Sequence, residues 1–120
     1  MSLQTIGKRL VELCNQGKNF DVMHTMYAPD IVSVEPTGQE TKGKTPVIQK
    51  SQRWAAGVTI HAEKVLGPFF HGADRFATQT TFEITRKATG KRITLEEVTV
   101  YTVKDDLIMR EEFFFGGDSW

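Results

Sequence analysis

The chain is poor in cysteine and carries no excess of charge of either sign. Its single cysteine, Cys14, excludes an internal disulfide and fits a cytoplasmic protein. Its 15 basic and 15 acidic residues cancel, which argues against nucleic-acid binding and gives no attraction toward an anionic membrane. No apolar run approaches the roughly 20 residues that span a bilayer, and the N-terminus lacks the apolar core of a secretory signal. We therefore expect a cytoplasmic protein with neither nucleic acid nor membrane as a partner.

Several chemical motifs are also missing. His24, His61 and His71 lack the close spacing of zinc ligands, and no cysteine lies beside them. The sequence has no glycine-rich phosphate loop between a strand and a helix, and no serine-centred nucleophile elbow. We expect no metal site and no cofactor.

The first half of the chain has helical periodicity. Apolar residues recur at three- and four-residue steps from Leu3 to Cys14, with Ser2 as the expected N-cap and Gly17 as the expected stop. A second, shorter helix is expected from about Asn19, ended by Pro29.

A third helix is expected in the segment "KTPVIQKSQRW". Thr45 would cap it, Pro46 would occupy its first position, and Trp54 would close its apolar side.

From Val58 onward the pattern changes to the two-residue period of strands. The segments "VTIHAEKVL", "DRFATQTTFEITRK", "KRITLEEVTVYTVK" and "LIMREEFFFG" are predicted strands, separated by turns in "GPFFHGAD", "KATGKR" and "VKDDLI". Three helices followed by antiparallel strands predict one α+β domain over residues 1–120. A sheet of this length should curl, with the helices on its concave side.

An acidic residue at the end of an apolar strand raises the question of function. The segment from Ile31 to Val34 reads as a strand, and Glu35 follows it directly before Pro36. Glu35 is either a solvated turn residue or a base at the rim of a pocket.

The segments "MYAPDIVSVEPTGQETKG" and "TPVIQKSQRW" resemble the nuclear-transport-factor-2-like (NTF2-like) superfamily, and within it the SnoaL-like and ketosteroid-isomerase-like members. The hairpin "YTVKDDLIMREEFFF" is similar to their last two strands. The resemblance implies a cone-shaped α+β barrel with a pocket between helices and sheet, usually in a homodimer packed through the sheet. Members include isomerases, cyclases, dehydratases, hydrolases and binding modules.

The resemblance assigns a role to Glu35. In the isomerases the acidic residue before proline is the general base, and Glu35 holds that position here. The isomerases also use a first-helix Tyr and a protonated Asp as oxyanion donors. Here the matching helix reads "KRLVELC" and the matching strand position is Thr99. Since losing one such donor typically costs about 10²–10³ in rate, a standard ketosteroid isomerase is not expected.

Other residues on the last two strands can replace the missing donors. By the two-residue period, one strand face carries Glu97, Thr99 and Tyr101, and the facing one carries Glu111, Phe113 and Phe115. A turn centred on Asp105 would place Thr99 opposite Glu111, whereas a two-residue turn would place it opposite Glu112. A buried Glu111 would be neutral and could donate a hydrogen bond; alternatively, it forms a surface charge pair with Arg110.

The remaining candidates each have two interpretations. The aromatic residues Trp54, Tyr101, Phe113 and Phe115 are core residues that can also line a ligand cavity. His61 is a surface or interface residue, or a second acid–base group if its strand face is concave. For the adjacent Glu96 and Glu97, alternation requires one to face inward, and both assignments stay open.

Two functions therefore remain. The first is an acid–base enzyme without a cofactor, an isomerase, cyclase or dehydratase, that acts on a small apolar carbonyl compound. Glu35 would be its base, and Thr99, Tyr101 and Glu111 would orient the substrate oxygen. The second is a ligand-binding or dimerisation module without catalysis, in which Glu35 is a rim residue. In either case a homodimer through the sheet is expected.

Overall fold

The computed structural model describes residues 1–115 and contains the three predicted helices. They are α1 (Leu3–Asn15), α2 (Asn19–Met26) and α3 (Lys44–Ala56). The Ser2 side chain accepts a hydrogen bond from the Thr5 amide at 3.1 Å, which confirms the N-cap of α1. Gly17 follows the helix with a φ of 74°, a left-handed value that glycine adopts without strain.

Two predicted helix boundaries are wrong. Helix α2 ends at Met26 and not at Pro29, because the chain turns directly into a strand at Tyr27. Helix α3 has Gly43, with no side-chain cap, before its first residue Lys44. Thr45 and Pro46 are therefore its second and third residues, where a missing N–H is still tolerated because first-turn amides have no helical partner.

Six strands form one mixed sheet. They are β1 (Tyr27–Val34), β2 (Glu40–Lys42), β3 (Val58–His71), β4 (Arg75–Arg86), β5 (Arg92–Lys104) and β6 (Leu107–Phe115). Their order is β2-β1-β6-β5-β4-β3, with β1 parallel to β6 and all other pairs antiparallel. The short β2 lies in a segment predicted as loop, and it pairs only with β1.

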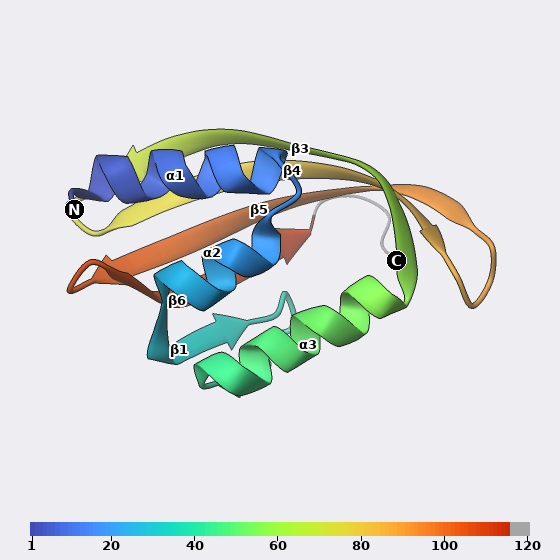
Figure 1. The fold of residues 1–120 in the computed structure, drawn as a ribbon, viewed down its shortest axis with the longest axis horizontal. Coiled ribbons are helices and arrows are strands. Elements are labelled where there is room, and N and C mark those ends of the chain that lie inside the picture. The colour runs from blue at the N-terminus through green and yellow to red at the C-terminus, as the bar shows by residue number, and fades with distance from the viewer. Residues whose placement is uncertain (116–120) are drawn as a thin grey trace.

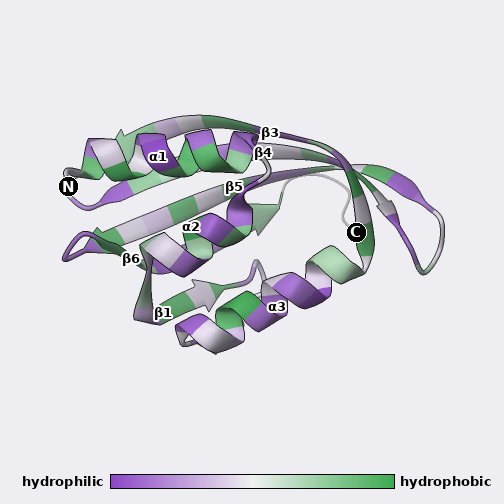
Figure 2. Ribbon diagram, viewed as in Figure 1, coloured by the Kyte–Doolittle hydropathy of each residue, from purple (hydrophilic) through white to green (hydrophobic). Residues whose placement is uncertain are grey.

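The long strands curl around the helices without closing into a barrel. Figure 1 shows β3, β4 and β5 arching along α1, while α2 and α3 lie across the concave side. The first and last strands in the order, β2 and β3, do not pair with each other, so the sheet stays open. In Figure 2 the hydropathy colours alternate along α1 and the long strands, as expected for elements with one buried face.

Strand β3 is longer and less regular than predicted. It continues through "GPFF" to His71, so only the end of "GPFFHGAD" is a turn. Its register shifts between Ile60 and Ala62, which is a β-bulge at His61. The extra residue reverses the alternation, so that Glu63 and Val65, which pair with the buried Phe82 and Thr80, lie on the inner face.

The hairpin between β5 and β6 decides which glutamate faces inward. Its turn is formed by Asp105 and Asp106, both with positive φ, as in the two-residue turns that favour hairpins. The register then shifts by one residue, so Tyr101 pairs with Glu111 and Thr99 pairs with Phe113. Both predicted partners of Thr99 are wrong, because no turn or periodicity signal in the sequence indicates this second bulge.

The core lies between the helices and the concave side of the sheet. Its members include Ile6, Leu10, Val22, Ile31, Val47, Val65, Phe76 and Ile108. Phe76 on β4 is fully buried and stacks on Tyr101, with 5.0 Å between ring centroids. On β4 the predicted inward face is confirmed, since Phe76, Thr78, Thr80 and Phe82 are all buried.

The outer face of the sheet carries exposed apolar side chains. Val98 and Phe114 are cross-strand neighbours on this face, and both are exposed. Two copies are expected to associate through the sheet, on this outer face. The homodimer stays a prediction. Among residues 1–115, none of the helices has the length and apolar character needed to cross a membrane.

We expect Phe76→Ala to lower the free energy of unfolding by about 3–5 kcal/mol, because it leaves a cavity at the centre of the core. Chemical denaturation followed by circular dichroism measures the change. Phe69 on β3 is 56% exposed, so Phe69→Ala is the matched control, with a change within about 0.5 kcal/mol. Equal effects of the two substitutions would contradict the assigned core.

Candidate functional site

A cavity of about 840 Å³ lies between the helices and the concave side of the sheet. All but one of the predicted site residues line it, namely Glu35, Trp54, His61, Glu97, Tyr101, Glu111, Phe113 and Phe115. Such a volume suits a small organic molecule. The fold thus brings together residues from three helices and several strands that are far apart in the sequence.

Thr99 is the predicted site residue that does not line the cavity. Its side chain is only 1% exposed, and the wall at this point is formed by Tyr101. Burial raises the pKa of the Tyr101 hydroxyl well above its usual value, and a hydrogen bond with Thr99 opposes that shift. Thr99 therefore supports Tyr101, and its contact with a substrate stays a prediction.

Glu111 is the most deeply buried charged residue among those described, at 1% exposure. The hydroxyl of Tyr27 donates a hydrogen bond to its Oε1 atom. Its Oε2 atom has no hydrogen-bond partner within residues 1–115, and the residue lines the cavity. Burial raises the pKa of the Glu111 carboxyl, while hydrogen bonds with Tyr27 and Ser33 and the charge of Lys50 oppose this. The arrangement favours a protonated carboxyl that can donate into the cavity.

The alternative prediction, a surface pair between Glu111 and Arg110, is wrong. Arg110 lies on the opposite face of β6, where its Nε atom is 3.1 Å from Glu112. It also approaches Glu40 of β2 at 3.9 Å. The bulge in the β5–β6 hairpin produces this result, because it sets which of two adjacent glutamates points toward the helices.

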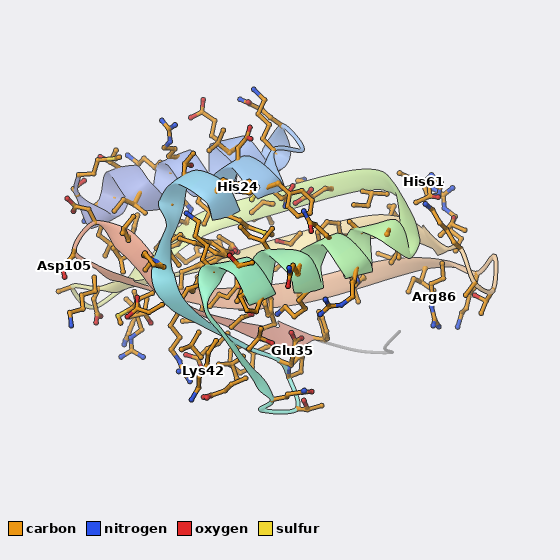
Figure 3. The ribbon with its side chains drawn as sticks, turned by 60° about the horizontal axis from the view of Figure 1, so that its bottom comes forward. His24, Glu35, Lys42, His61, Arg86 and Asp105 are labelled. Carbon is orange, nitrogen blue, oxygen red and sulfur yellow. The ribbon has the colours of Figure 1, made fainter. Side chains whose placement is uncertain are left out.

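Glu35 lies at the rim of the cavity and is held by Lys50 of α3. The Nζ atom of Lys50 is 2.5 Å from Glu35 Oε1 and 2.6 Å from the Ser33 hydroxyl oxygen. The same ammonium lies 5.2 Å from the centre of the Phe113 ring. Figure 3 labels Glu35 beside α3, just beyond the end of β1.

Sequence reasoning missed Lys50. It precedes Trp54 by four residues and so lies on the same side of α3, which was the one available signal. Lys50 also connects the two carboxyls of the site, since Ser33 pairs with Glu111 across β1 and β6.

Glu97 resolves the ambiguity between adjacent glutamates, because it lines the cavity whereas Glu96 is exposed. Its cross-strand neighbours, Thr80 and Phe115, carry no charge. Burial, followed by the nearby charges of Glu111 and Glu63, raises the pKa of Glu97 to about 8. Glu97 is therefore a second carboxyl of the cavity that is protonated near neutral pH.

Glu63 is a further cavity residue that sequence reasoning missed. The side-chain amide of Asn19 donates a 2.7 Å hydrogen bond to it. Burial raises the pKa of Glu63, and this hydrogen bond opposes the shift. It was missed because only the bulge at His61 turns Glu63 inward.

His61 is exposed, and its Nε2 atom lies 2.7 Å from the Thr85 hydroxyl. Figure 3 shows it well apart from Glu35. It lines the cavity only near an edge of the sheet, so its role as an acid–base partner of Glu35 has no geometric support. Within the described part of the chain, no three His, Cys, Asp or Glu side chains are placed to hold a metal ion.

The raised pKa of Glu97 predicts a pH-dependent stability. A carboxyl with a higher pKa in the folded state stabilises the fold less as the pH rises from the unfolded value of 4.5 to about 8. We expect Glu97→Gln to raise the free energy of unfolding by about 1–3 kcal/mol at pH 8 and to change it little at pH 4.5. Urea denaturation at the two pH values measures both.

The matched control is Glu96→Gln, which removes the same charge from the exposed side of the same strand. It should change stability by less than about 0.5 kcal/mol at either pH. A Glu97→Gln protein no more stable than wild type at pH 8 would show that the carboxyl is not desolvated as described.

The family model of the SnoaL-like domain matches residues 1–115. A candidate SnoaL-like polyketide cyclase (carbohydrate phosphatase) from Mesorhizobium loti is 39% identical, with a TM-score of 0.89 over 95% of this chain and 99% of that one. A search of curated proteins finds no match.

More distant structures share the fold. A candidate SnoaL-like polyketide cyclase from Jannaschia is 17% identical with a TM-score of 0.72, covering 89% of this chain and 80% of that one. A protein from Catenulispora acidiphila with a ketosteroid isomerase-like fold, in complex with trimethylamine, is 14% identical with a TM-score of 0.73, covering 97% and 88%. These comparisons confirm the predicted family and fold and support a small-molecule pocket protein.

Proposed function

The chain belongs to the SnoaL-like family, and from this premise we propose that it is an acid–base enzyme acting on a small apolar carbonyl compound. Glu35 is the base that removes a proton from the carbon beside the carbonyl group. Glu111 is the acid that donates a hydrogen bond to the carbonyl oxygen. Isomerisation, cyclisation and dehydration can all begin with this proton transfer, and none of these steps requires a cofactor.

One observation carries the proposal. The buried Glu111 has an unpartnered Oε2 atom within residues 1–115, and the residue lines the same cavity as Glu35. A buried polar atom without a partner destabilises the fold by about 1–3 kcal/mol, so a substrate that pairs with it gains that interaction. A carboxylate accompanied by a donor in one cavity supports catalysis, whereas an isolated carboxylate supports only binding.

The proton balance of the step is simple. The Glu35 carboxylate takes the proton as the C–H bond breaks. The electron pair of that bond moves toward the carbonyl group, so that the substrate becomes an enolate. The O–H of Glu111 stabilises the negative charge on the enolate oxygen by hydrogen bonding, and Tyr27 holds the other oxygen of Glu111 in place. Glu35 then returns the proton to a different atom of the substrate.

Lys50 positions the base. Its ion pair keeps Glu35 next to the cavity, and its bond to Ser33 ties this pair to the strand beside Glu111. The ion pair is partly exposed, so its contribution to stability is small. Its role in the proposal is orientation, since catalysis depends on the placement of reacting groups.

Exchange of carbon-bound protons tests the base directly. We expect the protein to accelerate the incorporation of solvent deuterium at the carbon next to the carbonyl group of 2-tetralone. Proton NMR measures the exchange rate. Glu35→Gln should reduce the catalysed rate by about 10²–10⁴, the usual contribution of a general base. Glu12→Gln, on the exposed side of α1, is the matched control and should exchange as wild type does.

The competing function predicts a different result. A protein that binds 2-tetralone in a thermal-shift assay but gives no exchange above buffer would favour a ligand-binding module. Exchange that is equally fast in wild type and Glu35→Gln would exclude Glu35 as the base.

A further inference from the structure

The cavity contains more acidic groups than the proposed reaction uses. Glu35, Glu63, Glu97 and Glu111 line it, and they come from four separate segments of the chain. The proposal above assigns Glu35 and Glu111 and leaves Glu63 and Glu97 without a role. These two belong to strands β3 and β5, on either side of β4.

The basic groups of the cavity do not balance these carboxyls. Lys50 is paired with Glu35 and is thereby neutralised. Arg53 and His61 line the cavity but are exposed. The other titratable groups facing Glu97 are Cys14, Tyr27 and Tyr101, all buried, and none of them supplies a positive charge.

The inner wall also carries aromatic rings next to the unassigned acids. Phe115 is the cross-strand neighbour of Glu97, and Phe82 is the cross-strand neighbour of Glu63. Trp54 packs on Phe82 with 5.3 Å between ring centroids. Aromatic faces and carboxylates together attract organic cations.

The structure already holds one alkyl ammonium in such surroundings. The Nζ atom of Lys50 is bound by a carboxylate, a hydroxyl and the face of Phe113. The unassigned part of the cavity offers the same three kinds of group, in Glu97, Thr80 and Phe115. Here no side chain of residues 1–115 supplies the ammonium.

We infer that the substrate of this cavity carries an amine cation, which binds at Glu97 and Glu63 while its apolar body rests on the aromatic wall. The unpartnered Oε2 atom of Glu111 independently marks the cavity as a ligand site. An anionic ligand is disfavoured because the basic groups of the cavity are the paired Lys50 and the exposed Arg53 and His61. The inference rests on the proposed function, since the amine and the carbonyl group would belong to one substrate.

The inference also predicts proton release on binding. An ammonium is attracted by a carboxylate, and the pKa of Glu97 in the empty cavity is about 8. Glu97 must then lose its proton when the amine binds below that pH. The affinity should therefore rise by about an order of magnitude between pH 6.5 and 8.

Three probes with one ring system test the charge preference by isothermal titration calorimetry. They are 2-naphthylmethylamine, the neutral 2-naphthylmethanol and the anionic 2-naphthoate. At pH 8 we expect the amine to bind at least tenfold more tightly than the alcohol, and naphthoate to bind most weakly. Repeating the titration in buffers with different ionisation enthalpies should reveal the released proton.

Two variants locate the charge preference. Glu97→Gln should reduce amine binding to the level of the alcohol, and circular dichroism melting shows that it is folded. Glu96→Gln removes a carboxylate from the outer face of the same strand and should keep wild-type selectivity. Equal binding of amine and alcohol, tighter binding of naphthoate, no amine binding at millimolar concentration, or unchanged selectivity in Glu97→Gln would each overturn the inference.

The two proposals fail separately. Deuterium exchange of the neutral ketone by the wild-type protein tests the reaction, and amine selectivity of the wild-type protein tests the substrate class. Exchange without amine selectivity removes only the inference about the amine. Amine selectivity without exchange removes the reaction and leaves an amine-binding cavity.

Discussion

The burial of the Glu111 carboxyl is the constraint on which the site depends. A carboxyl removed from water is stable only if it is neutral or well paired. Glu111 has hydrogen bonds with Tyr27 and Ser33, and its Oε2 atom has no hydrogen-bond partner within residues 1–115. Desolvation raises the pKa of this carboxyl on the wall of the cavity and favours its protonated form. Helix packing against the sheet supplies the desolvation, so the chemistry of this residue follows from the core around it.

Burial also raises the pKa of two other carboxyls of the cavity, Glu63 and Glu97. Glu97 and Glu63 are partly buried beside Glu111, and their mutual repulsion adds to desolvation in raising the pKa of Glu97. Such an arrangement opposes stability, because uncharged residues of similar volume would pack there without desolvating a carboxyl. The same carboxyls, together with the adjacent aromatic rings, give the cavity its preference among ligands. Groups that reduce the stability of the fold are thus the ones that define the site.

Two β-bulges determine which residues reach the cavity. The bulge at His61 turns Glu63 and Val65 inward, and the shift in the β5–β6 hairpin turns Glu111 inward in place of Glu112. Because side chains alternate along a strand, one inserted residue exchanges the two faces for the rest of that strand. A site assembled across several strands therefore depends on features that occupy only one residue each.

The sequence by itself determined the helices, most of the strands and the family, because these follow from periodicity, capping and turn residues within short segments. It also singled out Glu35 as a candidate, since a strand end followed by proline is a local feature, but it left open whether this residue lies in a solvated turn or at the rim of a pocket. Only the tertiary structure decided that Glu111 and Glu63 point toward the helices and that Lys50 pairs with Glu35. It also decided that Tyr101 lines the cavity while Thr99 does not. Each of these depends on register between segments distant in the chain, and a bulge that sets the register leaves no periodic signal in the sequence.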